Sequence, residues 1–104
     1  MKKTTELIPM EVLNQVAPVI RNTAHPLRLR ILDYLQCAGE PQNVNQITEA
    51  TDVAQAFVSQ QLRILKDQGV LTCQRHGLFM MYEIANPALL HLLECIRMHG
   101  KDCK

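Results

Sequence analysis

The sequence predicts a single, mainly α-helical domain that carries one β-hairpin. Aliphatic residues recur at helical spacing in most segments, which is typical of helices with one buried side. Between residues 70 and 84 the pattern changes to two short runs joined by a glycine-containing turn, as in a hairpin. There is no tryptophan and only 4% of the residues are aromatic, so the core must consist of Leu, Ile, Val and Met. With 104 residues, 47% hydrophobic and 20% charged, the chain has the composition of one globular domain and is too short for two cores.

The first two predicted helices span residues 11–24 and 26–37, after a lead-in over residues 1–8 that we expect to be frayed. Pro18 lies inside the first pattern and should kink or restart that helix, because proline lacks a backbone N–H. Pro26 suits the first position of the second helix, where this N–H has no helical partner anyway. The apolar residues that carry the two patterns are Val12, Val16, Val19, Ile20, Leu27, Leu29, Ile31, Leu32 and Leu35.

Residues 44–50 and 54–68 form two further predicted helices, separated by a turn over residues 51–53. Asn43 and Gln46 have the spacing of a capping box, in which each side chain bonds the backbone N–H of the other residue. The longer helix has an apolar side at positions i, i+4 and i+7 and a polar opposite side. A short helix, a tight turn and a longer helix together make a helix-turn-helix. The inward-facing residues of the longer helix are Val58, Leu62 and Leu65.

The hairpin strands are predicted over Val70–Arg75 and Leu78–Ile84, with His76-Gly77 as their turn. Asn86 is the expected cap of a last helix that starts at Pro87. This helix should end near Gly100. The complete order is therefore α-α-α-α-β-β-α in a single domain. A hairpin directly after a helix-turn-helix is a wing.

This arrangement predicts binding to double-stranded DNA. The second helix of a helix-turn-helix fits the major groove, where Gln, Ser and Arg read base edges, and a wing reaches phosphates or the minor groove. The formal charge of +1 excludes a histone-like polycation but still allows a few basic side chains on one face. An ordinary polar helix beside an ordinary hairpin would show the same periodicity. The predicted DNA-binding residues are Gln55, Ser59, Gln60, Gln61, Arg63, Arg75 and His76.

Several linked motifs give the chain a resemblance to a known family. The segments His25–Leu32 and Val58–Leu71, with Arg75, Gly77 and Tyr82–Ile84 in the hairpin, resemble the ArsR/SmtB-type winged-helix repressors. The resemblance implies a winged helix-turn-helix that forms a homodimer through its first and last helices. It also implies a repressor that binds a pseudo-palindromic operator and is released by an inducer. The chain departs from the usual pattern at three positions, where it has Ala54, Phe57 and Gln61.

Two metal sites known in the family do not match this chain. One needs Cys-x-Cys on the third helix, where this chain has Val44-Asn45-Gln46. The other pairs Asp and His near the start of the last helix with His and either Glu or His near its end. His99 and Asp102 match the late pair, but the early positions hold Asn86 and Ala88, so a complete zinc site of this type is not expected.

The last helix nevertheless carries a stripe of its own. At 100° per residue, His91, Cys95, His99 and Asp102 fall within about 80° of one another, and Cys103 follows. Family members that bind arsenite through cysteines near the C-terminus make Cys95 and Cys103 the best candidates. We therefore expect a thiophilic metal or metalloid as the inducer, with no metal needed for folding. In the alternative interpretation, the two histidines are dimer-interface or solvent residues and Cys95 is a small packed residue.

Thiol redox chemistry is the second hypothesis for induction. Relatives that sense persulfide or oxidant have one cysteine on the second helix and one at the end of the last, and Cys37 and Cys103 are the corresponding pair here. Both are displaced from the relatives' positions, by about one turn at Cys37. Cys73 falls in a predicted strand, where a packed or half-exposed role is expected.

Other function classes find no support in the sequence. There is no glycine-rich phosphate loop, no Gly-x-Ser-x-Gly and no His-Glu-x-x-His, so we do not expect an enzyme. No apolar run approaches the roughly 18 residues that cross a bilayer. Lys2 and Lys3 mimic the start of a signal peptide, but Glu6, Pro9 and Glu11 interrupt any apolar stretch after them. We expect a cytoplasmic protein without a membrane partner, whose cysteines are thiols rather than a structural disulfide set.

Overall fold

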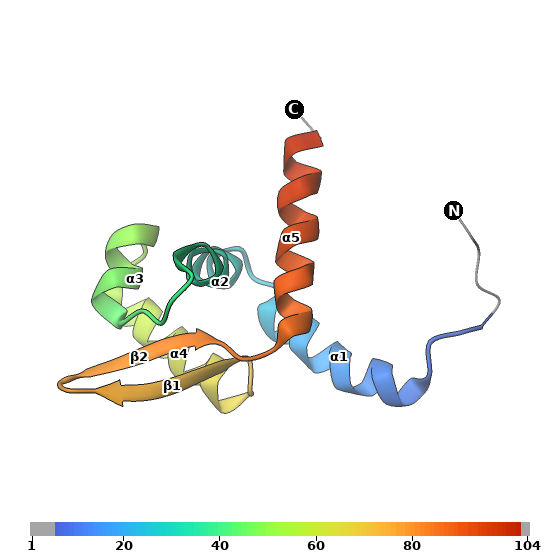
Figure 1. Ribbon diagram of the computed structural model, residues 1–104, viewed down its shortest axis with the longest axis horizontal. Helices are drawn as coiled ribbons and strands as arrows, with labels where there is room; N and C mark the ends of the chain where they lie inside the picture. The colour runs from blue at the N-terminus through green and yellow to red at the C-terminus, as the bar shows by residue number, and fades with distance from the viewer. Residues whose placement is uncertain (1–5, 103–104) are drawn as a thin grey trace.

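The computed structural model describes the backbone of residues 6–102 and the side chains of residues 6–99. Its element order confirms the predicted mainly α-helical fold with one hairpin (Figure 1). A short helix, a turn and a longer helix follow one another as predicted, and the hairpin comes directly after them. The elements are α1 (Met10–Thr23), α2 (Pro26–Ala38), α3 (Val44–Thr51), α4 (Gln55–Asp67), β1 (Leu71–His76), β2 (Phe79–Ile84) and α5 (Pro87–Asp102).

The first helix is not restarted at Pro18, and the last helix ends about where it was expected. α1 continues through Pro18 without being divided. Proline cannot donate to the carbonyl four residues earlier, but that carbonyl belongs to the exposed Asn14, where water can replace the missing donor. α5 ends at Asp102, which is close to the expected end near Gly100. Glycine tolerates the left-handed conformation that ends helices but does not impose it.

The hairpin turn lies one residue later than expected. His76 pairs with Phe79 in the antiparallel register, so the two turn residues are Gly77 and Leu78. Gly77 has φ +63°, and Leu78 keeps a negative φ. A positive φ at the first turn residue alone is the type II′ pattern, which matches the twist of the two strands. Leu78 therefore occupies the outermost point of the hairpin.

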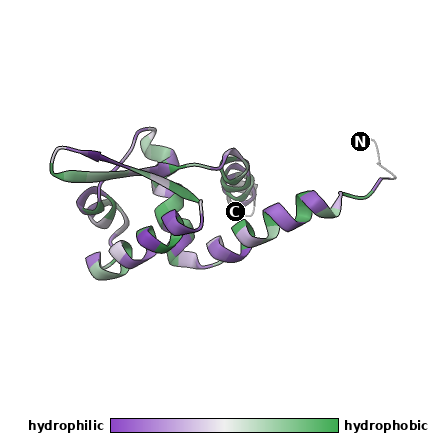
Figure 2. Cartoon of the chain, turned by 90° about the horizontal axis from the view of Figure 1, so that it is seen from below, coloured by the Kyte–Doolittle hydropathy of each residue, from purple (hydrophilic) through white to green (hydrophobic). Residues whose placement is uncertain are grey.

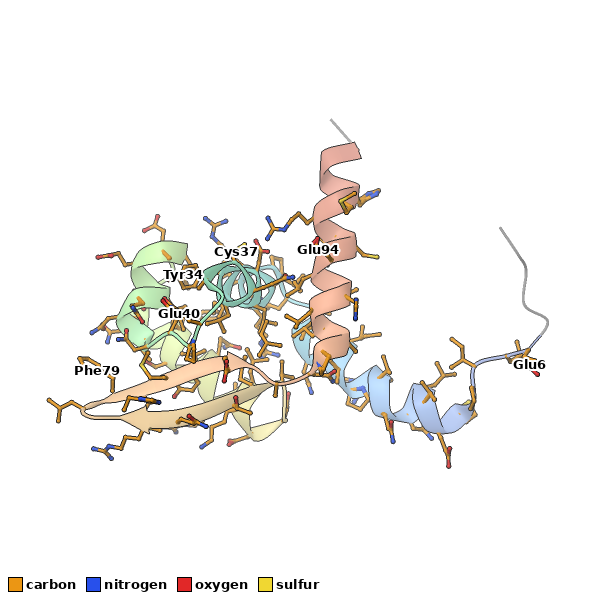
Figure 3. The ribbon with its side chains drawn as sticks, viewed as in Figure 1. Glu6, Tyr34, Cys37, Glu40, Phe79 and Glu94 are labelled. Atoms are coloured by element: carbon orange, nitrogen blue, oxygen red, sulfur yellow. The ribbon has the colours of Figure 1, made fainter. Side chains whose placement is uncertain are left out.

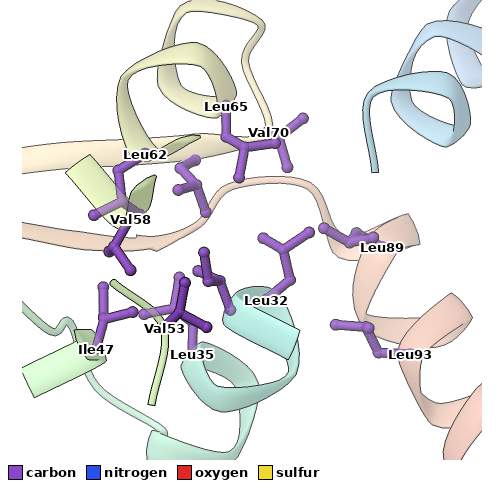
Figure 4. Close-up of a cluster of buried hydrophobic side chains, with 12 residues drawn as sticks. Leu32, Leu35, Ile47, Val53, Val58, Leu62, Leu65, Val70, Leu89 and Leu93 are labelled. Atoms are coloured by element: carbon purple, nitrogen blue, oxygen red, sulfur yellow. The ribbon is translucent and has the colours of Figure 1, made fainter. Parts of the chain in front are cut away.

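The hydrophobic core lies between α2, α3, α4 and the first turns of α5 (Figure 4). The three residues of α4 that were predicted to face inward are fully buried, which confirms the phase of that helix. Burial of each such side chain contributes about 1.5–3 kcal/mol to folding. The core residues are Ile31, Leu32, Leu35, Ile47, Val53, Val58, Leu62, Leu65, Val70, Leu71, Leu89 and Leu93.

Polar caps and hydrogen bonds fix the remaining connections. The predicted capping box forms, because Asn43 and Gln46 exchange side-chain to backbone bonds of 2.8 Å. Gln42 pairs with Tyr82 of β2 through two backbone hydrogen bonds of 2.9 and 2.8 Å. The Tyr34 hydroxyl of α2 donates to the side chain of Gln42. The base of the hairpin is thus attached to α2 through this residue.

α1 contributes almost nothing to the core. Its one buried side chain is Thr23, whose hydroxyl donates to the carbonyls of Val19 and Ile20 at 3.0 and 3.2 Å. Figures 1 and 2 show α1 extending away from the other helices, with hydrophobic residues recurring along it. The C-terminal half of α5 also rises out of the domain (Figure 1). Among the described residues, no helix is both long and apolar enough to cross a bilayer.

Candidate nucleic-acid interface

The outer side of α4 presents a row of polar side chains. Gln55, Ser59 and Arg63 are exposed at successive i, i+4 positions, and Gln60 is exposed beside them. The opposite side of the same helix is buried against α2 and α3. Because one side is held in the core, the orientation of the polar row is fixed. The row has the width and the donor and acceptor groups that a major groove accepts.

The first turn of α4 has no side-chain cap. Ala54 stands at the cap position and makes no side-chain hydrogen bond, as its lack of a polar group requires. The first backbone N–H groups of a helix have no partner within the helix. Such groups bind phosphate well, because the positive end of the helix dipole adds to their donor capacity.

Gln61 differs from its predicted role. It is only 6% exposed, and its side-chain oxygen accepts a hydrogen bond from Nε of Arg28 in α2. Arg28 also donates from Nη1 to the carbonyl of Asn22, 2.7 Å away, near the end of α1. Gln61 therefore fixes α4 to its neighbours instead of facing solvent. The sequence held a signal for this, because residues 58, 61, 62 and 65 form one continuous helical stripe.

The bulky Phe57 packs against a residue outside α4. Its ring centroid lies 5.9 Å from that of His25, which precedes α2. The imidazole Nδ1 of His25 accepts the backbone N–H of Leu27 at 3.2 Å and so caps that helix. Phe57 is thus accommodated where α4 meets the start of α2.

The wing, residues 71–84, extends the polar surface of α4. Arg75 and His76 are exposed, and Nε of Arg75 donates to the carbonyl of Gly77 at 3.3 Å. At the base of the wing, burial raises the pKa of Tyr82, and its cross-strand neighbour Cys73 raises it further. The charge of Arg63 acts in the opposite direction on the same pKa. β1 packs against α4, so the wing lies beside that helix.

The candidate inducer residues lie on α5. His91, Cys95 and His99 are exposed along that helix. The side chain of Asp102 and the whole of Cys103 lie outside the described residues. Within the described part of the chain, no three His, Cys, Asp or Glu side chains lie close enough to hold a metal ion. The described cysteines, at positions 37, 73 and 95, are free thiols.

Cys37 belongs to a cluster that the sequence did not reveal. One guanidinium nitrogen of Arg97 in α5 donates to the Cys37 sulfur at 2.9 Å and to the carboxylate of Asp33. Asp33 and then Cys37 raise the pKa of Arg97. Residues 95 and 97 point about 160° apart around a helix, so Cys95 projects from the side of α5 opposite to Arg97.

Comparison with known proteins agrees with this geometry. Residues 25–72 match the sequence model of a family described as "Bacterial regulatory protein, arsR family". The chain is 35% identical over 95 residues to the HTH-type transcriptional repressor SmtB of Mycobacterium tuberculosis, covering 90% of this chain and 69% of that protein.

Two solved structures have the same architecture. The AntR antimony-specific transcriptional repressor has a TM-score of 0.80 and 26% identity, covering 96% of this chain and 92% of its own. A homodimeric winged helix-turn-helix DNA-binding domain from Mycobacterium bovis has a TM-score of 0.71 and 28% identity, covering 97% of this chain and 92% of its own. The fold is therefore a winged helix-turn-helix, in which α4 is the recognition helix and the hairpin is the wing. The chain belongs to the ArsR/SmtB family of DNA-binding transcriptional repressors.

Proposed function

We propose that this protein is a homodimeric repressor that binds a pseudo-palindromic operator and leaves it when a thiophilic metal or metalloid binds near the end of α5. The observation that carries the DNA-binding part is the two-sided character of α4. Its inner side is fully buried, and its outer side presents Gln55, Ser59, Gln60 and Arg63 to solvent. Arg75 and His76 on the wing supply contacts to the phosphates beside that groove.

Exposed apolar residues on α1 and α5 support a homodimer. A hollow of about 140 Å³ lies between the two helices, lined by Val19, Ile20, Leu89 and Leu92 among others. Monomeric proteins rarely leave contiguous apolar surfaces of this kind in water. The related mycobacterial domain is a homodimer. The large apolar side chains exposed on these helices are Met10, Val12, Leu13, Ile20, Leu90, Ile96 and Met98.

The DNA-binding proposal is tested by selecting an operator from random duplexes and measuring affinity by fluorescence anisotropy. Gln60→Ala should cost about 1–3 kcal/mol and relax the preference for one base pair. Arg75→Ala, as a phosphate contact, should weaken all sequences alike and reduce the salt slope by about one. Arg63→Ala follows one of these two patterns, according to whether it contacts a base or a phosphate.

Gln15 provides a control, because it is exposed on α1, outside α4 and the wing. Gln15→Ala removes the same side-chain type as Gln60→Ala and should leave the base preference and the salt slope unchanged. If Gln60→Ala and Arg63→Ala both bind like the parent, the assignment of α4 is wrong. If the chain sediments as a monomer and no palindromic sequence is selected, the repressor proposal fails.

The inducer site is best completed by two chains. His91 and His99 lie about 12 Å apart along the helix axis, so only neighbouring pairs in the His91–Cys95–His99 row can share an ion. A metal of tetrahedral preference needs further ligands, from Asp102, from Cys103 or from a second copy of α5. Soft thiolates suit thiophilic ions. AntR, which shares the fold, is antimony-specific, and this supports a metalloid inducer for the present chain.

Redox sensing through Cys37 and Cys103 is the second candidate, and the contact of Cys37 with Arg97 favours it. Cys37 is exposed, so a persulfide or an oxidant can reach its sulfur. Modification of that sulfur would disturb the Arg97 contact that joins α5 to α2. A change at the thiol would then affect α2, against which α3 of the helix-turn-helix packs.

A further inference from the structure

The end of the wing combines positive charge with an unusual amount of exposed apolar surface. Leu78 is 89% exposed, and the next two residues, Phe79 and Met80, are 50% and 41% exposed. Figure 3 shows Phe79 at the outer end of the hairpin. Single exposed apolar residues are common on proteins, but three in succession at a protruding tip indicate an interaction surface.

The turn holds Leu78 in one place. The positive φ of Gly77 creates a tight two-residue turn, and the bond from Nε of Arg75 to the Gly77 carbonyl closes the tip. The Arg75 guanidinium therefore lies beside Leu78, and the exposed His76 precedes the turn. An apolar side chain beside a guanidinium suits a polyanion that also offers an apolar slot.

The position of the tip relative to α4 identifies such a polyanion. β1 packs against α4, and both lie in the lower part of Figure 1, while α5 rises to the other side. With α4 in the major groove, a wing attached to it reaches the neighbouring minor groove. That groove is about 6 Å wide, which admits one side chain at the end of a hairpin but not a whole helix. Apolar side chains in the minor groove can enter between base pairs and bend the duplex.

We propose that Leu78 inserts into the minor groove beside each half-site, partly unstacks one base step and bends the operator. This inference rests on the proposed DNA-binding function. It makes operator choice depend on how easily the step under the wing deforms, in addition to the bases that α4 reads. Pyrimidine–purine steps such as TA unstack readily, whereas A-tracts are stiff. The protein should therefore prefer operators with TA at that step.

The test uses the full-length protein and operator duplexes that differ only at the step under the wing, TA or AA. Bending is measured by energy transfer between dyes at the duplex ends, and unstacking by the fluorescence of 2-aminopurine at the step. The parent should bend the TA duplex, increase the 2-aminopurine fluorescence and bind TA several-fold more tightly than AA. Leu78→Ser should lose all three effects, while Leu78→Phe should retain the bend and the preference.

Leu7→Ser is the matched control, because Leu7 is 92% exposed and lies before α1, away from the wing. It should behave like the parent. The salt slope of Leu78→Ser should also be unchanged, since leucine carries no charge and neutralises no phosphate. Because Leu78 contacts so little of its own chain, urea unfolding should show Leu78→Ser and Leu78→Phe to be as stable as the parent.

If the parent binds the operator but Leu78→Ser bends it equally, the inference is wrong and the repressor function stands. If the parent binds no operator at all, the proposed function itself has failed. If Leu78→Ser instead loses binding to anionic phospholipid vesicles and keeps the bend, the tip serves a membrane surface and the inference is overturned.

Discussion

Arg97 of α5 forms an ion pair with Asp33 of α2, and the same guanidinium nitrogen contacts the sulfur of Cys37. α2 in turn packs against α3, and Nε of Arg30 in α2 donates to the carbonyl of Thr51 at 3.0 Å. The helix that carries the candidate inducer residues is thus joined to the helix-turn-helix by named contacts. A displacement of α5 has a direct physical path to α3 and from there to the recognition helix.

The first prediction concerns this ion pair. In a double-mutant cycle of Arg97→Ala and Asp33→Ala, the two substitutions should be less than additive in urea unfolding at low salt. Both side chains are substantially exposed, so the coupling should be small and should disappear near 1 M salt, where charges are screened within about 3 Å. Gln15→Ala in place of Arg97→Ala should give an additive cycle at every salt concentration. Additive effects of the Arg97 and Asp33 substitutions at low salt would show that the pair does not form in solution.

The second prediction separates two neighbouring glutamines of α4. Gln61→Ala should destabilise the protein by about 1–3 kcal/mol, because it removes the buried acceptor of the Arg28 hydrogen bond. The exposed Gln60→Ala should change stability by less than about 0.5 kcal/mol. The effect on operator recognition should be the opposite: Gln60→Ala should lose base discrimination, and Gln61→Ala should keep it. Equal stabilities of the two variants, measured by urea unfolding, would contradict the buried role of Gln61.

Local patterns predicted most of the fold. The i, i+4, i+7 spacing of Val58, Leu62 and Leu65 fixed the phase of α4, and the Asn43–Gln46 capping box marked the start of α3. These signals depend on neighbours within one or two turns, so they are visible in a single sequence. The predicted break at Pro18 failed because an exposed helix can leave one carbonyl to water. A proline signals a lost hydrogen bond, and whether the helix ends there depends on its surroundings.

The candidate functional residues were predicted less completely, because some of their contacts join residues that are distant in sequence. Arg97 and Asp33 are separated by 64 residues, and no local pattern connects them. Leu78 was missed for a different reason: a shift of one residue in the turn moved it from the start of a strand to the exposed tip. In a hairpin, a one-residue change in register alters which side chain reaches the end.

The third prediction concerns alkaline pH. Burial and then Cys73 raise the pKa of Tyr82 above its ordinary value of 10.0. A raised folded-state pKa means that the neutral phenol is favoured in the folded protein. Its stabilising contribution is therefore present below pH 10 and is lost as the pH rises through the folded pKa. Tyr82→Phe should show a shallower decrease in unfolding free energy above pH 10 than the parent.

Cys73→Ala separates the two causes of that pKa shift. It removes the thiol but leaves most of the burial, so its pH dependence should lie between those of the parent and Tyr82→Phe. The measurement is urea unfolding at a series of pH values from neutral to strongly alkaline. Parallel curves for the parent and Tyr82→Phe would contradict the raised pKa.

The fourth prediction distinguishes the two inducer hypotheses by the release of labelled operator. Arsenite or antimonite should release labelled operator from the parent protein. This release should be lost in Cys95→Ser and Cys103→Ser but kept in Cys37→Ser. In the redox hypothesis, persulfide releases labelled operator from the parent protein, and this release requires Cys37 and Cys103 but not Cys95. Cys73→Ser is the control for a cysteine substitution outside both proposed sites and should respond like the parent.

The size of the required effect favours multivalent binding at α5. To shift the dimer from 99% competent for DNA to 1%, an inducer must prefer the incompetent state by about 5.5 kcal/mol, or roughly 10⁴-fold. Two or three metal–thiolate bonds can provide this preference, whereas one oxidised exposed thiol cannot unless it forms a bridge. Ligation itself deprotonates the thiols, so release by a metalloid should also liberate protons, which calorimetry in buffers of different ionisation enthalpy measures. If a protein with serine at positions 37, 95 and 103 still responds to either inducer, both hypotheses fail. The remaining candidates are then His91, His99 and Asp102.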